Sequence, residues 1–174
     1  MTPILYLFLW GIFTALLLAF TLARAHPYRF SRFLAFESIL SLIFLNAEAW
    51  FLDPFSWPQI LSWLFLAASL ALAWSGFYML KSRGMPEGDF EDTTALITTG
   101  IYGKIRHPLY GSLIVFGLGA FLKDFSLIGG LLLLTTVLGA LRTARIEEGH
   151  NLERFGEEYR VYMKRTRRFI PFIY

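Results

Sequence analysis

Long runs of apolar residues, separated by short basic segments, constrain the fold of this chain more than any other feature. Three runs, 3–23, 33–52 and 60–80, reach about the 20 residues that an α-helix needs to cross a bilayer. Two shorter runs, 109–122 and 125–141, are separated only by Lys123 and Asp124, which predicts a helical hairpin. In lipid each segment must satisfy its own backbone amides, so these runs form helices. The sequence predicts an all-α integral membrane protein with about five transmembrane helices, the last two forming a hairpin.

The composition supports a single membrane domain over residues 1–174. The chain is 56% hydrophobic and has a mean hydropathy of +0.52, and a soluble chain of this length has too little interior to bury so much apolar surface. It contains no Cys, which excludes disulfides, thiolate nucleophiles and Cys-ligated metals. The three His residues are far apart, and no zinc motif is present, so no metal site is expected.

Basic residues indicate the orientation. Every Lys and Arg except Lys123 lies in 24–32, 81–106 or 142–168, which the five spans place on one side of the membrane. The positive-inside rule then puts the N-terminus outside and the C-terminus in the cytoplasm, in a cell inner membrane or its equivalent. On that cytoplasmic face, 144–165 is predicted to form an amphipathic helix along the headgroups. The basic surface favours contact with anionic lipid over nucleic acid.

One polar cluster, Arg106-His107-Pro108, stands at the start of the fourth span. Proline is favoured at the first position of a helix, so Pro108 predicts the helix start. The unpaired N–H groups of a helix N-terminus, with Arg106 beside them, suit a carboxylate or phosphate. The alternative is an ordinary helix start with an interfacial arginine as anchor.

A second polar cluster, Glu147-Glu148, follows the fifth span on the same face. These carboxylates are candidates for binding ribose hydroxyls or a cationic group. The alternative is a solvated helix surface, with Arg142 and Arg145 pairing with the glutamates or contacting lipid phosphate. Because both clusters share the cytoplasmic side, they can meet and form one site.

A third set of polar residues lies inside the second span. Glu37, Ser41 and Glu48 fall on one helical stripe, because steps of four and seven return to the same helix face. Ionisable groups within a membrane are costly and commonly face a cavity. This stripe is therefore either a polar lining of a substrate cavity or a set of side chains that extend to the two interfaces. In the fourth span, Gly117 and Gly119 indicate close helix packing.

Residues 87–172 resemble a known family. The stretch Leu96-Ile97-Thr98-Thr99-Gly100-Ile101-Tyr102, then Arg106-His107-Pro108-Leu109-Tyr110, Glu147-Glu148 and Phe155-Gly156-Glu157-Glu158-Tyr159, is similar to the isoprenylcysteine carboxyl methyltransferases. That family is related to the phospholipid N-methyltransferases. The resemblance implies an integral-membrane methyltransferase that uses S-adenosylmethionine. It also implies that 1–80 supply three N-terminal spans and that 81–174 form the cofactor-binding catalytic part.

The resemblance also assigns roles to residues. It implies that the adenine lies beside 94–97, that Tyr102 closes on the cofactor, and that residues 107–110 hold its amino-acid end. Glu147 would bind the ribose or the amino group, with Glu87 as a further contact. The implied cofactor-binding residues are Glu87, Thr94, Ala95, Leu96, Ile97, Tyr102, His107, Pro108, Leu109, Tyr110 and Glu147.

The methyl acceptor is not defined by the resemblance. The isoprenylcysteine enzymes carry a substrate-binding arginine where this chain has Thr143, so a carboxylate and a phospholipid amine both stay open as lipophilic acceptors. An amine acceptor needs a base, for which Glu148 and Glu37 are candidates. A carboxylate needs none and favours a nearby arginine, such as Arg142 or Arg145. Two other classes remain: a membrane reductase using NADPH, similar to the sterol reductases, and a non-enzymatic transporter or scaffold.

Overall fold

The structure is a computed structural model that describes residues 3–23, 27–85 and 93–170. Within these residues the chain forms five α-helices and two short 3-10 helices, and one isolated parallel β-bridge joins Ile105 and Arg167. In chain order the elements are α1 (Pro3–Leu22), α2 (Arg29–Leu45), η1 (Ala47–Ala49), α3 (Trp57–Arg83), η2 (Gly100–Gly103), α4 (Pro108–Phe121) and α5 (Leu127–Arg165).

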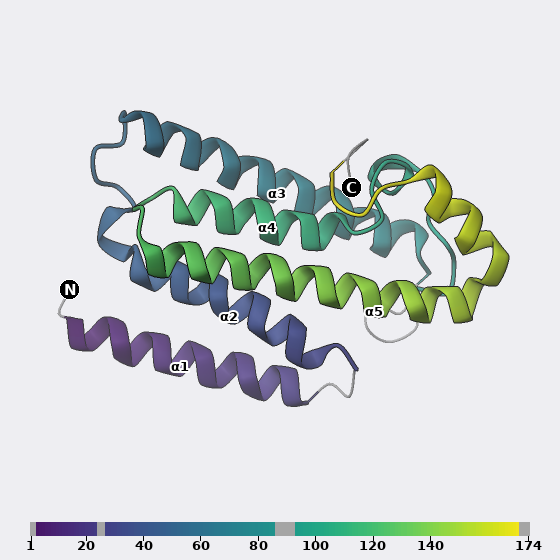
Figure 1. Cartoon of the computed structure of the whole chain (residues 1–174), viewed down its shortest axis with the longest axis horizontal. Helices are drawn as coiled ribbons and strands as arrows, with labels where there is room; N and C mark the ends of the chain where they lie inside the picture. The colour runs from purple at the N-terminus through teal and green to yellow at the C-terminus, as the bar shows by residue number, and fades with distance from the viewer. Residues whose placement is uncertain (1–2, 24–26, 86–92, 171–174) are drawn as a thin grey trace.

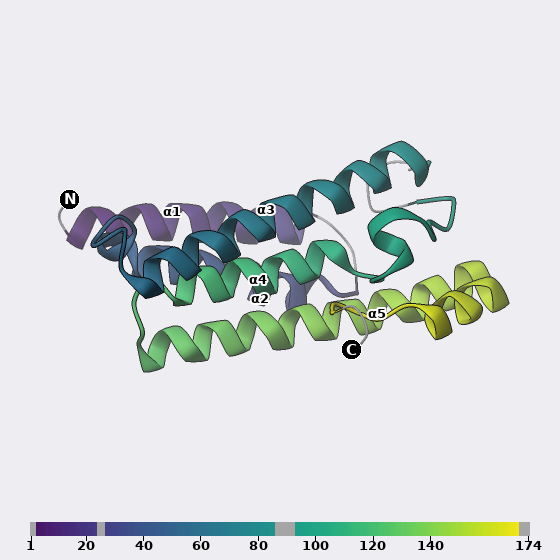
Figure 2. The same cartoon turned by 90° about the horizontal axis from the view of Figure 1, so that it is seen from above.

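The five α-helices lie side by side along the long axis of the molecule (Figure 1). The short α4 is central, because it packs on α3, α5 and α2, while α1 lies at the edge and packs mainly on α2 (Figures 1 and 2). Helices α2 and α3 both pack on α4 without extensive contact with each other in the described residues. The antiparallel pair of α4 and α5 confirms the predicted hairpin.

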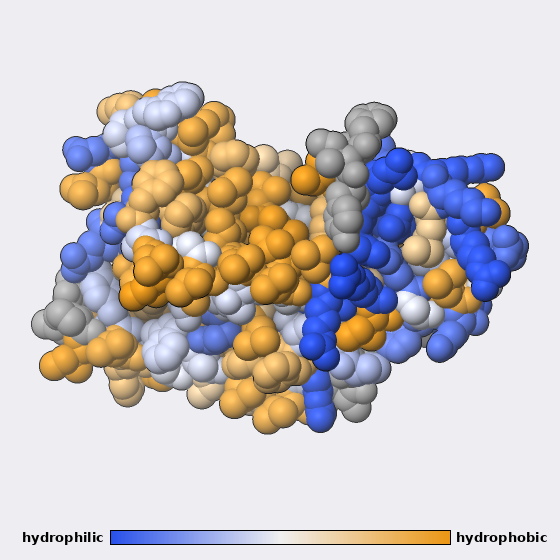
Figure 3. Space-filling view, in the orientation of Figure 1, coloured by the Kyte–Doolittle hydropathy of each residue, from blue (hydrophilic) through white to orange (hydrophobic). Residues whose placement is uncertain are grey.

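The helices have the apolar character of an integral membrane protein. Helices α1, α3 and α5 are each long and apolar enough to cross a membrane, whereas α4 is a shorter apolar helix of 14 residues. Large apolar side chains cover most of the visible face, and hydrophilic ones gather at the end that carries the C-terminal part of α5 (Figure 3). The molecule therefore has an apolar middle and one strongly hydrophilic end.

The helix starts follow local sequence signals. Proline occupies the first turn of α3 and of α4, where its missing N–H costs no helical hydrogen bond. Pro108 begins α4 as predicted, with His107 as the residue before it. Helix α5 begins after Ser126, whose Oγ accepts a hydrogen bond of 3.0 Å from the N–H of Gly129.

Small residues let the central helices approach closely. A Cβ built on Gly139 of α5 would lie 2.7 Å from the carbonyl oxygen of Ser31 in α2. A Cβ on Gly119 of α4 would lie 2.9 Å from Leu66 Cγ in α3, and one on Gly117 would lie 3.2 Å from Leu133 Cδ1 in α5. The predicted close packing around Gly117 and Gly119 is confirmed.

The second helix ends earlier than the apolar run predicts. Helix α2 stops at Leu45 because Asn46 is buried and donates hydrogen bonds from Nδ2 to the carbonyl oxygens of Ala120 and Asp124. Glu48 therefore lies in η1. The expected stripe of Glu37, Ser41 and Glu48 on one helix is wrong for Glu48.

The last apolar helix continues past residue 141 as far as Gly156, where a second helical segment begins in a new direction. The sequence predicts a fifth span that ends near residue 141 and a separate amphipathic helix over 144–165, but α5 runs from Leu127 to Arg165. Its direction changes at Gly156, which has φ 56° and ψ −125°, a conformation that glycine adopts without a Cβ penalty. The residues after Gly156 turn back toward the bundle, as the yellow end of the ribbon shows (Figure 1).

Candidate active site

A cavity of about 380 Å³ lies at the hydrophilic end of the bundle, where α4 begins and the C-terminal half of α5 passes it. Its walls come from 28–36, 73–80, 93–113 and 147–162, so helices α2, α3, α4 and α5 and the segment before α4 all contribute. This volume falls within the range of about 300–1,000 Å³ that is typical of small-molecule sites. Both polar clusters identified in the sequence contribute to this one cavity.

The start of α4 forms one wall of the cavity. His107, Pro108, Leu109 and Tyr110 all line it, as the resemblance implies. The N–H of Arg106 donates to the carbonyl oxygen of Arg167 at 2.7 Å, and that of His107 donates to the carbonyl oxygen of Arg168 at 3.1 Å. The C-terminal segment therefore fixes the backbone that enters α4.

Glu147 faces this wall from α5. Its Oε1 accepts a short hydrogen bond from the hydroxyl of Tyr110, and its Oε2 lies 3.6 Å from Nδ1 of His107. The carboxylate lines the cavity and is only partly buried. Glu147, Tyr110 and His107 therefore form one polar surface inside a cavity with many apolar lining residues.

Glu148 has a different environment from its neighbour in sequence. It is 4% exposed and does not line the cavity. Its Oε1 lies 2.8 Å from Nε of Arg106, and its Oε2 lies 2.6 Å from Nη2 of Arg168. A carboxylate held by two guanidinium groups stays ionised and is a poor proton acceptor. The geometry therefore argues against Glu148 as the catalytic base.

The two carboxylates control the charge of His107, whose side chain is buried. Nε2 lies 3.3 Å from Oε1 of Glu148, but makes no hydrogen bond of good geometry to any described residue. Burial alone would lower the pKa of His107, but the closeness and negative charge of Glu147 and Glu148 outweigh burial and raise the pKa above its ordinary value of 6.5. His107 is therefore poised to carry a positive charge beside the cavity.

The segment before η2 supplies an apolar part of the wall. Ala95, Leu96 and Ile97 line the cavity, and so does Tyr102 of η2, whose carbonyl oxygen accepts a 2.7 Å hydrogen bond from the hydroxyl of Tyr162. Thr94 does not line the cavity. Its N–H donates to the carbonyl oxygen of Gly84, and its Oγ1 donates to that of Met85. Glu87 lies outside the described residues.

Three residues proposed for catalysis lie away from the cavity. Arg142 and Arg145 are exposed on α5 and are not among the lining residues. Glu37 faces α1, where its Oε1 accepts hydrogen bonds from Thr14 Oγ1 at 2.9 Å and from Ser41 Oγ at 3.3 Å. The stripe around Glu37 therefore joins α2 to α1 and does not line this cavity.

Other lining residues were not predicted from the sequence. They are Tyr28 and Arg32 at the start of α2, and His150, Asn151 and Arg154 on α5. The three on α5 had a usable signal, because steps of three or four residues from Glu147 return to the same helix face. Tyr28 and Arg32 had none beyond their position in a basic loop, since only tertiary packing brings α2 to this end of α4.

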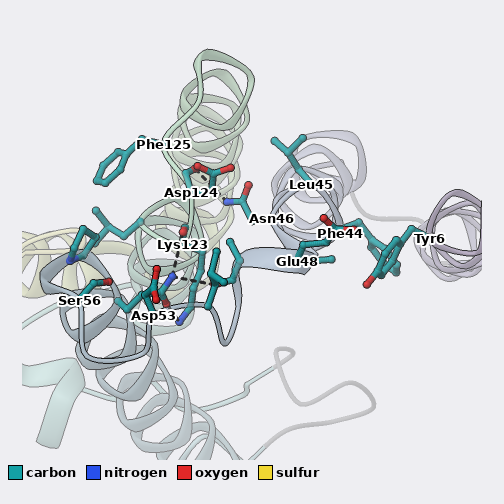
Figure 4. A pocket seen from close by; sticks show the side chains of 16 residues that line it. Tyr6, Phe44, Leu45, Asn46, Glu48, Asp53, Ser56, Lys123, Asp124 and Phe125 are labelled. Carbon is teal, nitrogen blue, oxygen red and sulfur yellow. Dashed lines mark hydrogen bonds between the residues drawn. The ribbon is translucent and has the colours of Figure 1, made fainter. Parts of the chain in front are cut away.

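A second cavity, of about 580 Å³, lies at the opposite end of the bundle, beside the turn between α4 and α5 (Figure 1). Figure 4 shows the side chains that line it. Its buried polar groups are committed to the protein. Lys123 Nζ donates to Gln59 Oε1 at 2.9 Å and lies 3.7 Å from the ring centre of Trp63, while Gln59 Nε2 donates to the carbonyl oxygens of Ala49 and Lys123. With Asn46, these residues form an end network that connects the end of α2, the start of α3 and the turn between α4 and α5. We interpret this end as structural.

Comparison with known proteins identifies the family of this chain. A sequence profile described as phospholipid methyltransferase matches residues 57–158, more than half of the chain. This chain belongs to the phospholipid methyltransferase family. The matched region of this chain contains the residues at the start of α4 and Glu147. Tyr28 and Arg32 lie outside the matched region, and so does the part of the tail after residue 158.

Curated relatives point in the same direction. The protein-S-isoprenylcysteine O-methyltransferases of Rattus norvegicus, Mus musculus and Homo sapiens are 31%, 30% and 29% identical to this family member over 134 residues. The aligned region covers 70% of this chain and 47% of each relative. The chain thus spans about half the length of the curated relatives it matches. The resemblance found in the sequence is confirmed at the level of the family.

Proposed function

We propose that this protein is a methyltransferase that uses S-adenosylmethionine and modifies a lipid-like acceptor at the cytoplasmic face of the membrane. The observation that carries the proposal is the convergence of His107, Tyr110 and Glu147 in one cavity that also extends between apolar residues of α2, α3 and α4. A donor from water and an acceptor from lipid can meet only where a site has access to both phases.

The lining residues fit S-adenosylmethionine. His107 lines the cavity at the positive N-terminal end of α4, and this end, together with the charge of the imidazole, suits a carboxylate. Glu147 suits an amino group or ribose hydroxyls, and Ala95 to Ile97 provide an apolar wall for a base. When bound, this cofactor supplies a methyl group on a sulfonium. The protein residues orient both reactants and exclude water, which lowers the barrier by fixing their geometry.

The apolar part of the cavity supports a lipid-like acceptor. Phe36 of α2, Ala73 of α3 and Leu113 of α4 line it, and α2 and α3 make no extensive contact with each other in the described residues. An acyl or prenyl chain suits this surface, because burying apolar groups there removes them from water. The polar end of such an acceptor would then lie toward His107.

Among possible acceptor groups, the cavity favours a carboxylate over an amine. Two guanidinium groups, those of Arg32 and Arg154, are among the lining side chains, and such groups bind carboxylates well. An amine acceptor needs a base, but Glu148 is held by two arginines and Glu37 faces α1. Among the lining residues not assigned to the cofactor, His150 could act as a base for an amine, and it defines the alternative outcome of the acceptor assay.

The proposed orientation follows from the distribution of charge. The cavity is at the end of the bundle that carries the arginines of α5, whereas Lys123 lies at the opposite end. The positive-inside rule therefore favours a cytoplasmic site and an external N-terminus. A cytoplasmic site also has direct access to a soluble cofactor.

Calorimetry on the detergent-solubilised protein tests the cofactor assignment. We expect S-adenosylhomocysteine to bind with a Kd in the low to middle micromolar range, equivalent to roughly −6 to −8 kcal/mol. Glu147→Ala and His107→Ala should each weaken binding at least tenfold, or about 1.4 kcal/mol. Glu158→Ala, which removes an exposed carboxylate on the same helix, is the control. Binding of NADPH without binding of S-adenosylhomocysteine would replace this proposal with the reductase alternative, and binding of neither would favour the transporter or scaffold.

Transfer of a labelled methyl group into a total lipid extract tests the acceptor. Base-labile label indicates a carboxyl methyl ester and agrees with the proposal. Base-stable label in a lipid amine fraction would contradict the preference for a carboxylate and point to His150. Arg154→Gln should lower turnover while leaving affinity for S-adenosylhomocysteine nearly unchanged, because an interaction with the acceptor alone does not contribute to donor binding.

A further inference from the structure

The tail of the chain returns to the entrance of α4. After Gly156 redirects α5, the N–H of Arg167 donates to the carbonyl oxygen of Lys104 at 3.2 Å. The next carbonyl groups accept hydrogen bonds from the N–H groups of Arg106 and His107. The ring of Phe169 lies 6.2 Å from the imidazole of His107, measured between ring centres. Residues 166–169, which we call the tail strap, therefore lie against the candidate cofactor site.

One charged side chain of the tail strap reaches a buried partner. Arg168 holds both oxygens of Glu148, with Nη2 at 2.6 Å from Oε2 and Nε at 3.1 Å from Oε1. Arg106 holds Oε1 of the same carboxylate at 2.8 Å and also donates from Nη1 to the carbonyl oxygen of Thr166 at 2.6 Å. A two-pronged arginine–carboxylate contact fixes direction as well as charge.

This arrangement determines where Glu148 directs its charge. Oε1 lies 3.3 Å from His107 Nε2, so the carboxylate that the two arginines hold is also the charged neighbour of this buried nitrogen. Nε2 makes no hydrogen bond of good geometry to any described residue and is sealed from solvent, so Glu148 acts on it through its charge and position. Without Arg168, Glu148 would lose one of its two guanidinium partners and could move closer to that nitrogen.

We propose that Arg168 is a positioning residue: by holding Glu148 beside the start of α4, it fixes the imidazole of His107 and its charge at the wall of the cofactor cavity. The part that concerns the cofactor rests on the proposed function, whereas the effect of Arg168 on His107 does not. The charged and titratable groups around His107 are Glu147 and Glu148 from α5, Tyr110 from α4, Arg106 before α4 and Arg168 from the tail strap. Of these, Arg168 is contributed by the segment that follows the turn at Gly156.

Three variants test the inference. Arg168→Gln removes the charge and the two-pronged contact, whereas Arg168→Lys keeps the charge and loses the geometry. Arg167→Gln is the matched control, since it removes the same charge from the neighbouring residue, whose side chain is exposed and whose tail-strap hydrogen bonds are made by the backbone. We expect Arg168→Gln to weaken binding of S-adenosylhomocysteine about tenfold near neutral pH, with Arg168→Lys in between and Arg167→Gln unchanged.

The pKa of His107 provides a second measurement, because it would not change if Arg168 had a purely structural role. In nuclear magnetic resonance titrations of the protein without ligand, Arg168→Gln should raise the pKa of His107 further, because a positive charge is removed and Glu148 turns toward the imidazole. If Arg168→Gln does not fold, the same titration of Arg168→Lys should give a smaller rise. An unchanged pKa of His107 in the folded variant would overturn the inference. If the wild type binds no S-adenosylhomocysteine but the pKa shift appears, the proposed function fails and the positioning of His107 by Arg168 stands.

Discussion

Replacing Gly139 with alanine tests how tightly α2 is held against α5. The added methyl group would lie 2.7 Å from the carbonyl oxygen of Ser31, 3.0 Å from the Cβ of Ala35 and 3.1 Å from its nitrogen. Ordinary contact requires about 3.4 Å, so the two helices would have to separate by about 0.7 Å. The hydrogen bond of 2.9 Å between Ser31 and Thr143 spans the same contact and would be stretched.

The magnitude follows from three contributions. Overpacking of this kind costs about 1–3 kcal/mol, and weakening the Ser31–Thr143 hydrogen bond costs about 1 kcal/mol. The higher helix propensity of alanine returns up to about 1 kcal/mol. We therefore expect Gly139→Ala to lower the free energy of unfolding by about 1–3 kcal/mol. Because α2 carries Tyr28 and Arg32 to the cavity wall, turnover should also fall.

Unfolding in detergent, followed by tryptophan fluorescence, measures this effect. Gly11→Ala is the matched control: it makes the same change in α1 at a position where the new Cβ has no neighbour within 4 Å, so it should be neutral or slightly stabilising. If Gly139→Ala is as stable as Gly11→Ala, the close approach of α2 and α5 does not exist in the folded protein.

Three further predictions concern the two ends of the bundle. The pKa of His107 in the folded protein is raised above 6.5, so the protonated imidazole stabilises the fold. This stability is complete below about pH 6.5 and is lost as the pH rises through the folded-state pKa. His107→Gln should flatten this part of a plot of unfolding temperature against pH. Lys123→Ala leaves the buried amide oxygen of Gln59 without its donor and should destabilise the protein by about 1–3 kcal/mol in chemical unfolding, whereas unchanged stability would show that water replaces the ammonium group. Gly156→Ala places a Cβ at φ 56° and should strain the turn by about 1–3 kcal/mol. The variant should bind S-adenosylhomocysteine more weakly, and its tail should be cleaved faster by a protease. Gly149→Ala is the control and should show neither effect, because its new Cβ has no neighbour within 4 Å.

The sequence was most informative where local signals dominate. Hydropathy located the apolar segments, since each must satisfy its own backbone in lipid, and Pro108 marked the start of α4. The motif resemblance assigned His107, Tyr110 and Glu147 to one site, and the structure places all three at one cavity. The division into residues 1–80 and 81–174 stays a prediction, and α2 contributes residues to the cavity from the first part.

Prediction failed where the partner of a side chain decides its role. The helical period correctly put Glu37 and Ser41 on one face of α2, but the period does not say which neighbour that face meets, and here the neighbour is α1. Likewise, Glu147 and Glu148 are equivalent in sequence. In the structure, Glu147 lines the cavity, whereas Glu148 is buried against Arg168. Arg168 reaches Glu148 because the chain turns at Gly156, and the sequence does not predict that turn.

The network of Asn46, Gln59 and Lys123 has a mechanical consequence. It fastens the end of α2, the start of α3 and the turn between α4 and α5 at one end of the molecule, while α2 and α3 make no extensive contact with each other along the described chain. Helix α3 has 27 residues, or about 40 Å of length, and packs mainly on α4, so a tilt of α3 relative to α2 would pivot at this fastened end. A tilt of about 3° moves the far end by about 2 Å. A small rotation at one end of the molecule would therefore change the separation of Phe36 and Ala73, which line the cavity from α2 and α3 near the other end.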